Sequence, residues 1–176
     1  KAALDTVAIG SVSANLVRWE EISLRDLMYC MMVASANDAA VVIAQYVGGT
    51  YENFIELMNQ KAMEIGCRDT HYGNAHGLHD EQTYTTARDM YHIAKACYET
   101  PGFMDIATTV HYYLPANTRH PDKYLITSTI SMQNKGYPSL YRDYVYGLKT
   151  GSTEEAGRNF VTVCEADGER YILVVM

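Results

Sequence analysis

The sequence predicts an α+β fold in which a helical part, about residues 23–108, packs on an antiparallel β-sheet formed by about residues 109–176. In the first part, apolar residues recur at the three- and four-residue spacing of helices with one buried face. Residues 109–149 are rich in Thr, Tyr, Val and Ile, which favour strands. Near the end, two strand-like runs flank Asp167-Gly168, a strong signal for a two-residue hairpin turn.

Four helices are predicted from their start signals and their apolar faces, after an irregular segment over residues 1–22. Ser23 and Thr86 each open a capping box with an acidic residue three positions later, and a further helix is expected to start near Thr50. The apolar pattern of the first helix stops at residues 35–38, resumes at Ala40, and ends at Gly48-Gly49. Residues 67–85 are expected to form a loop because they are rich in His, Gly, Asn, Asp and Thr.

Three strands are predicted near the end of the chain, over residues 144–150, 159–166 and 169–176. Strict alternation along the first of them would place one set of side chains on the same face: Val145, Gly147, Lys149 and Gly151. The glycines are expected to leave the backbone beside the lysine uncovered. A peptide could then lie along this strand edge next to an ammonium group.

Composition limits the possible function classes. A length of 176 residues with 48% apolar residues suits one domain with a sizeable core. A net charge of −7 argues against nucleic acid as a partner, and no signal peptide or membrane-spanning run is visible. Four widely spaced cysteines fit no metal or redox motif, so buried reduced thiols are expected at Cys30, Cys67, Cys97 and Cys164.

A cluster of histidines in the predicted loop raises the question of a metal. His71, His76 and His79 lie close to Asp80 in sequence, but they form no H-E-x-x-H motif and no regular ligand face. We therefore predict neither a metal nor a cofactor, and a structural role in the loop for His76.

Two tripeptides carry the chemical signal. Ser35-Ala36-Asn37 interrupts two predicted helices, and Lys149-Thr150-Gly151 ends a predicted strand. They match the S-x-N and K-T-G signatures of serine enzymes that react with penicillin. Each is weak alone, and Ser13-Ala14-Asn15 repeats the first pattern in an irregular stretch. A plain helix end followed by an N-cap would also explain the polar residues at 35–38.

Further segments in the same order make the chain resemble the D-alanyl-D-alanine carboxypeptidases, the low-molecular-mass penicillin-binding proteins. Besides the two tripeptides, these segments are Leu57-Met58-Asn59, His76-Gly77-Leu78, residues 84–90, and Tyr146 to Thr153. The resemblance implies a β-lactamase/transpeptidase-like fold and a serine peptidase of the bacterial cell envelope, outside the cytoplasm. It also implies two partners, a peptidoglycan stem peptide ending in D-Ala-D-Ala and β-lactam antibiotics.

The resemblance also implies a role for each site residue. Ser35 would relay a proton to the leaving amine, and Asn37 would hold the substrate amide and the lysine of the family's first motif, which is absent from this chain. Lys149 would supply positive potential. The terminal carboxylate would be bound by the segment Thr150, Gly151 and Ser152 with help from Arg170, and the backbone N–H of Ser152 would supply half of an oxyanion hole.

One signature of the family is missing from the chain. S-x-x-K carries the nucleophile, and no serine here has a lysine three residues later. The chain is therefore expected to be an N-terminally incomplete domain over residues 1–176, inactive alone, which self-associates through surface that the missing part would cover.

Two alternatives stay open. One is a class A β-lactamase or serine glutaminase of the same fold, for which Glu81 lies in a suitable interval for a general base. The other is a non-catalytic domain that binds peptidoglycan or a partner protein.

Overall fold

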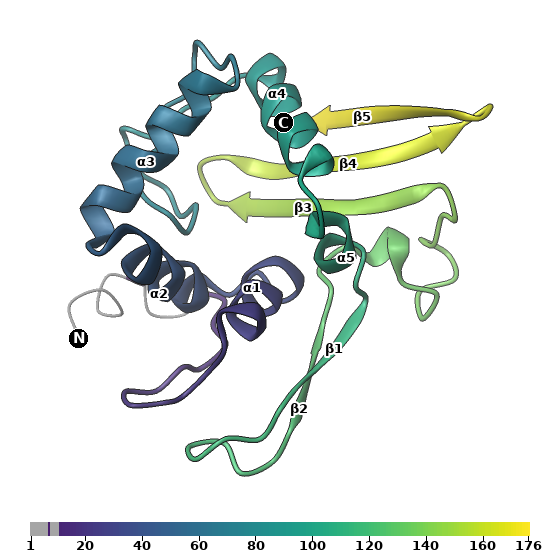
Figure 1. The fold of residues 1–176 in the computed structure, drawn as a ribbon. Helices are drawn as coiled ribbons and strands as arrows, with labels where there is room; N and C mark the ends of the chain where they lie inside the picture. Colours follow the sequence, from purple (N-terminus) through teal and green to yellow (C-terminus); the bar gives the residue numbers. More distant parts are fainter. Residues whose placement is uncertain (1–6, 8–10) are drawn as a thin grey trace.

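The computed structural model describes residue 7 and residues 11–176 (Figure 1). Their helices are α1 (Leu24–Val33), α2 (Asn37–Gly48), α3 (Tyr51–Glu64), α4 (Ala87–Glu99) and α5 (Phe103–Ala107). The irregular start is confirmed for residues 11–22, and most of its earlier residues lie outside the described part. The first four helices occupy the predicted places.

The helix starts follow the capping chemistry of the sequence. The side chains of Ser23, Thr50 and Thr86 each accept a hydrogen bond from the backbone N–H three residues later, which satisfies one of the unpaired donors of the first turn. Helix α5 was not predicted. It follows Gly102 and has only 5 residues, too few to show a repeating apolar pattern.

The strands form two separate antiparallel sheets. Within the described residues, β1 (His111–Leu114) pairs only with β2 (Tyr124–Thr127), and this hairpin packs against α1. The second sheet has the order β3-β4-β5, with β3 (Val145–Thr153), β4 (Gly157–Ala166) and β5 (Glu169–Val175). The turn at Asp167-Gly168 joins β4 and β5 with positive φ at both residues, as the hairpin signal predicted.

Two clusters of buried side chains hold these layers together. One joins α1 and α2 to the β1–β2 hairpin and includes Cys30, Val33 and Ile126. The other joins α4 and α5 to the three-stranded sheet and includes Ala107, Leu148 and Val161. Helix α5 lies against β3 in Figure 1. The second cluster therefore fixes the position of β3 relative to the helices.

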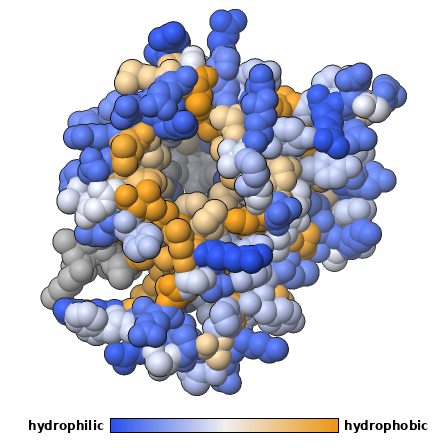
Figure 2. All heavy atoms as spheres, in the orientation of Figure 1, coloured by the Kyte–Doolittle hydropathy of each residue, from blue (hydrophilic) through white to orange (hydrophobic). Residues whose placement is uncertain are grey.

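The face seen in Figure 2 is hollowed between the helical part and the three-stranded sheet, and hydrophobic side chains rim the hollow. All four cysteines are free thiols, as expected, but only Cys30 and Cys67 are buried. No helix among the described residues combines the length and the apolar character needed to cross a membrane.

Candidate active site

Ser35 lies in the short break between α1 and α2. Its φ of 60° is in the left-handed region, and the backbone N–H of the next residue, Ala36, donates to the carbonyl of Cys30 at 3.1 Å. The N-cap of α2 is Ala36, which makes no side-chain cap. Capping therefore does not explain Ser35 or Asn37, and the interpretation of residues 35–38 as a plain helix boundary is wrong for these two side chains.

Lys149 reaches Ser35 from the sheet. Its Nζ donates to Ser35 Oγ at 2.6 Å and to the carbonyl oxygen of Thr150 at 2.7 Å. Residues 114 positions apart in sequence thus meet across the boundary between the two parts of the fold. Burial lowers the pKa of Lys149 to about 8, because removal from water disfavours the charged ammonium. Both the charged and the neutral form of the amine are therefore accessible at pH values close to neutral.

A β-bulge sets the direction of the lysine. Tyr146 is opposite Val163 and Lys149 is opposite Val161, so Gly147 and Leu148 together face a single residue of β4. The expectation that Val145 and Lys149 share a face is therefore wrong, because the extra residue reverses the alternation between them. The bulge turns Leu148 into the core, where it is 4% exposed.

The two glycines that flank the lysine have different roles. Gly147 has a φ of +58°, and a Cβ atom there would lie 3.0 Å from the carbonyl oxygen of Ala107 in α5. It is required by close packing and does not uncover the backbone for a ligand. A Cβ at Gly151 would meet nothing within 4 Å, so only this second glycine borders open space, as predicted for a ligand-facing edge.

Asn37 is held by the irregular segment before α1. Its backbone N–H and its side-chain Nδ2 both donate to the carbonyl oxygen of Val12, at 2.9 and 3.1 Å. No described residue donates to its Oδ1. The side chain is therefore oriented through its nitrogen, and its oxygen is left to accept a hydrogen bond from a ligand amide.

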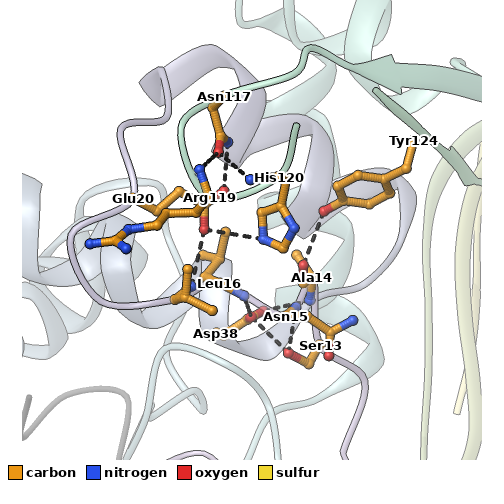
Figure 3. A network of polar contacts seen from close by, with 11 residues as sticks. Ser13, Ala14, Asn15, Leu16, Glu20, Asp38, Asn117, Arg119, His120 and Tyr124 are labelled. Carbon is orange, nitrogen blue, oxygen red and sulfur yellow. Dashed lines mark hydrogen bonds and ion pairs between the residues drawn. The ribbon is translucent and has the colours of Figure 1, made fainter. Parts of the chain in front are cut away.

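Asp38 fixes the segment that holds Asn37 (Figure 3). Its buried carboxylate accepts hydrogen bonds from Ser13 Oγ at 2.7 Å, and from the backbone N–H groups of Ala14, Leu16 and Ala39 at 2.9 to 3.0 Å. The second Ser-Ala-Asn tripeptide thus has a structural role, because Ser13 is a donor to this carboxylate. Asp38 was not singled out from the sequence.

The same network continues to the connection between β1 and β2 (Figure 3). Glu20 accepts from the backbone N–H of Val17 at 3.0 Å and from Asn117 Nδ2 at 2.7 Å, and the Tyr124 hydroxyl donates to the carbonyl of Ala14 at 3.0 Å. The segment over residues 11–22 is therefore tied at both ends, although it contains neither helix nor strand.

A groove of about 880 Å³ lies between the helical part and the sheet. Six of the predicted site residues line it together, namely Ser35, Asn37, Lys149, Thr150, Gly151 and Ser152. The hydroxyls of Thr150 and Thr129 share a hydrogen bond of 2.7 Å at the wall. No aspartate or glutamate lines the groove among the described residues, although the chain has a net charge of −7.

Three lining residues were missed or given a lesser role by the sequence analysis. Thr129 carries no motif signal, and Arg158 could have been found only by extending the hairpin register from Lys149. His76 was expected to be structural; it lines the groove, and burial lowers the pKa of its imidazole despite the opposing effect of Asp80. Its Nδ1 accepts from the backbone N–H of Leu78 at 3.2 Å, so a local structural role is present as well.

Arg170 does not lie in this groove, which corrects its predicted role. It is opposite Glu165 at the far end of β4, and its Nε lies 3.4 Å from Glu165 Oε2. Its guanidinium also donates to the hydroxyl of Tyr98. Ser152 pairs with Arg158, seven positions earlier on β4 than Glu165, which separates Arg170 from the groove end by about 24 Å of strand.

Metal binding finds no support in the described part of the chain. No group of three or more His, Cys, Asp or Glu side chains there could hold an ion. The histidines of the loop face different partners: His71 Nδ1 is 2.7 Å from the carbonyl of Gln82, whereas His76 faces the groove.

Comparison with known proteins agrees with this geometry. Residues 2–176 match the D-alanyl-D-alanine carboxypeptidase family of S11 peptidases. The chain belongs to this family. It is 33% identical over 168 residues to the D-alanyl-D-alanine carboxypeptidase DacF of Bacillus subtilis, and 32% identical over 174 residues to DacD of Escherichia coli. It covers 41% of each of these relatives, which in turn align with 96% and 97% of the chain.

Solved structures show that the fold is that of the S11 family. The DD-transpeptidase of Streptomyces K15 matches 99% of the chain with a TM-score of 0.86 at 25% identity, and the chain covers 68% of that structure. The carboxypeptidase DacD of Francisella tularensis matches 99% of the chain with a TM-score of 0.83 at 25% identity, and the chain covers 51% of it. The predicted family and the α+β transpeptidase-like fold are therefore confirmed.

Proposed function

We propose that the protein is a serine-type D-Ala-D-Ala carboxypeptidase, and that this chain carries the proton-relay and carboxylate-binding side of its active site. The 2.6 Å hydrogen bond between Lys149 Nζ and Ser35 Oγ across the groove carries this proposal. Membership of the S11 family supports the reaction class. The chain spans about two fifths of the curated relatives named above, so the activity is a property of the whole protein.

The pair of Ser35 and Lys149 is suited to move a proton. A serine hydroxyl is a poor acid, but an adjacent ammonium favours its oxyanion and can replace the proton that it gives away. With its pKa lowered to about 8, Lys149 exchanges protons near neutral pH more readily than an ordinary lysine. In the proposed reaction, Ser35 passes a proton to the D-Ala amine as the peptide bond breaks.

The open end of β3 is suited to hold the substrate. Gly151 borders free space, and the hydroxyls of Thr150 and Ser152 line the groove. A peptide that lies along this edge would place its terminal carboxylate near the two hydroxyls and its scissile carbonyl near the backbone N–H of Ser152. Asn37 Oδ1 would accept a hydrogen bond from the substrate amide on the opposite side.

The β-lactamase alternative receives less support from the structure. Its general base would have to reach a water molecule in the groove, and Glu81 is an exposed residue of the turn at 81–82 that does not line it. The non-catalytic alternative differs from our proposal only in the nucleophile, which the 176 residues do not supply in an S-x-x-K motif.

Penicillin labelling of protein expressed from the complete coding sequence tests the proposal. We expect one fluorescent penicillin bound covalently per protein, and release of D-Ala from a peptide ending in D-Ala-D-Ala. The 176-residue chain is expected to show neither. Rapid turnover of penicillin by the whole protein would favour a β-lactamase, whereas peptide binding without labelling would favour the non-catalytic domain.

Location and self-association complete the proposal. Peptidoglycan is the proposed substrate, so we place the protein in the cell envelope, which fractionation of cells that produce it would test. Self-association of the 176-residue chain stays a prediction, and analytical ultracentrifugation would test it.

A further inference from the structure

Gln133 makes a set of hydrogen bonds that no sequence motif marks. It is the last residue of a short 3-10 helix, η2 (Ser131–Gln133), in the connection between β2 and β3, and it is half-buried. Its Oε1 accepts a hydrogen bond from the backbone N–H of Gly147 at 3.0 Å. Its Nε2 donates to Ser128 Oγ at 2.8 Å and to the carbonyl oxygen of Ala107 at 3.4 Å. One amide thus joins the bulge of β3, the residue after β2 and the end of α5.

The amide supplies partners to backbone groups at the bulge. A β-bulge interrupts the regular ladder of backbone hydrogen bonds, so its residues need other partners. Gly147 is one of the two bulge residues, and the Ala107 carbonyl oxygen is the atom that a Cβ at Gly147 would meet at 3.0 Å. A glutamine side chain has both an acceptor and donors, so it can pair with an N–H and a carbonyl at once, which an apolar or basic side chain cannot do.

The place of the bulge decides on which face of the sheet Lys149 lies. Side chains alternate along a strand, and the extra residue at Gly147 and Leu148 reverses this alternation just before the lysine. If the extra residue moved past Lys149 along β3, the lysine would turn from the groove to the opposite face. A contact that holds the bulge at Gly147 therefore also holds the direction of the lysine.

The segment that carries Gln133 is attached to the helical part as well. The backbone N–H of Thr129 donates to the carbonyl oxygen of Val33 at 3.2 Å, and Val33 is the last residue of α1, two positions before Ser35. This segment therefore connects the backbone next to Ser35 with the backbone next to Lys149. The same two places are joined across the groove by the 2.6 Å hydrogen bond between the two side chains.

We propose that Gln133 is a positioning residue, which sets the distance between Lys149 Nζ and Ser35 Oγ by holding the bulge of β3. This inference rests on the proposed function and deepens it. Gln133 is not one of the described residues that line the groove, so it would act on the substrate only through these two side chains. A displacement of about 1 Å in a reacting group can slow a reaction about 100-fold, so a small shift of the lysine is sufficient.

The test uses protein from the complete coding sequence and measures kcat and KM for release of D-Ala from a peptide ending in D-Ala-D-Ala. Gln133→Met keeps the length of the side chain and removes the amide, whereas Gln133→Glu keeps an acceptor for the Gly147 N–H. Asn134→Ala is the matched control. It removes the neighbouring buried amide, which among the described residues bonds only to the backbone N–H of Gly136. Circular dichroism melts verify that each variant is folded.

We expect Gln133→Met to lower kcat about 10- to 100-fold and to leave KM within about threefold, because the amide acts on the proton relay and does not border the groove. Gln133→Glu should recover part of this loss, since it can still hold Gly147. Asn134→Ala should leave kcat within about twofold, as expected for a substitution away from the reacting groups.

The pH dependence of kcat separates positioning from a general loss of structure. In the unsubstituted protein kcat should change near pH 8, because burial lowers the pKa of Lys149 to about 8. A lysine that has left Ser35 is more hydrated, so in Gln133→Met the change should move toward pH 10.5, the ordinary pKa of lysine. The other titratable residues of the groove do not interfere: burial lowers the pKa of His76, and Arg158 keeps its charge in this range.

Two results would overturn the positioning role but not the proposed function. One is equal kcat for Gln133→Met and the unsubstituted protein, and the other is a lower kcat with an unmoved pH dependence or an equal loss in Asn134→Ala. If Gln133→Met does not fold, Gln133→Glu and Ser128→Ala, which removes an acceptor of the amide, provide the same comparison. No release of D-Ala by the unsubstituted protein would overturn the proposed function and, with it, the role of Gln133.

Discussion

The two walls of the groove are held in place by different kinds of contact. On the helical wall, a buried carboxylate, Asp38, gathers hydrogen bonds from a segment without regular structure and so holds Asn37 through Val12. On the sheet wall, Lys149 is aimed by a bulge and by the close approach of Gly147 to α5. One wall depends on polar partners and the other on packing, so substitutions should damage them in different ways.

The largest effect is expected at the polar wall. Replacement Asp38→Ala removes the acceptor of four hydrogen bonds and leaves buried donors without partners, so we expect the free energy of unfolding to fall by about 4 kcal/mol. Urea denaturation measures this loss. Asp38→Asn keeps one acceptor oxygen and should lose about half as much. An unchanged unfolding midpoint for Asp38→Ala would show that the network does not hold the wall.

The next effect compares the two Ser-Ala-Asn tripeptides directly. In protein from the complete coding sequence, Ser35→Ala should slow release of D-Ala by 10²- to 10³-fold, because it removes the hydroxyl that relays the proton. Ser13→Ala is the matched control and should change that rate less than twofold, since Ser13 does not line the groove and its hydroxyl bonds only to Asp38 and to the backbone N–H of Asn15 among the described residues. Similar rates for both variants would remove Ser35 from the mechanism.

The buried charge on the sheet wall should make stability depend on pH. The pKa of Lys149 is about 8 in the folded chain against 10.5 in the unfolded chain. Between these values the unfolded state binds more protons, so the free energy of unfolding rises with pH by up to about 3 kcal/mol. Below pH 8 the full cost of burying the ammonium is present.

Lys149→Met is the reference for this measurement, because it fills similar space without titrating. The difference in unfolding free energy between the chain and this variant should change between pH 8 and 10.5 and be flat from pH 6 to 7. Parallel profiles for the two proteins across the whole range would contradict a lowered pKa.

The packing contacts of the sheet wall are tested by its two glycines. Gly147→Ala combines a positive φ with a Cβ 3.0 Å from the Ala107 carbonyl, so we expect a loss of about 2 kcal/mol in thermal or urea unfolding. Gly151→Ala meets no atom within 4 Å and should change stability by less than about 0.5 kcal/mol. If both substitutions are equally tolerated, the approach of β3 to α5 does not fix Lys149.

The helices were easier to predict than the strands for a physical reason. Caps such as Ser23 and Thr86 are local, so the residues that form them are close in sequence. The bulge at Gly147 and Leu148 involves a contact with α5, about 40 residues earlier in the sequence. Because strict alternation ignores the bulge, it wrongly predicted that Val145 and Lys149 share a face of the sheet. The separate pairing of β1 and β2 is likewise a property of register that composition does not encode.

The site shows the same division. Motif spacing identified Ser35, Asn37 and Lys149 without any knowledge of distance. Arg170 was placed in the site because it lies on the last strand and matches a family position that helps to hold the carboxylate. Only the register shows that it is opposite Glu165, seven residues along β4 from the residue that pairs with Ser152. No sequence motif marks Thr129, and only its hydrogen bond with Thr150 in the structure identifies it as a residue of the site.

The backbone of Ser35 has a consequence for evolution of the site. A φ of 60° is a conformation in which glycine loses nothing, whereas a residue with a Cβ is strained by about 1 kcal/mol or more. Selection for durability alone would favour glycine at this corner. In the proposed reaction the hydroxyl at this corner relays a proton, so Ser35→Gly is expected to relieve the backbone strain and to remove the relay at the same time.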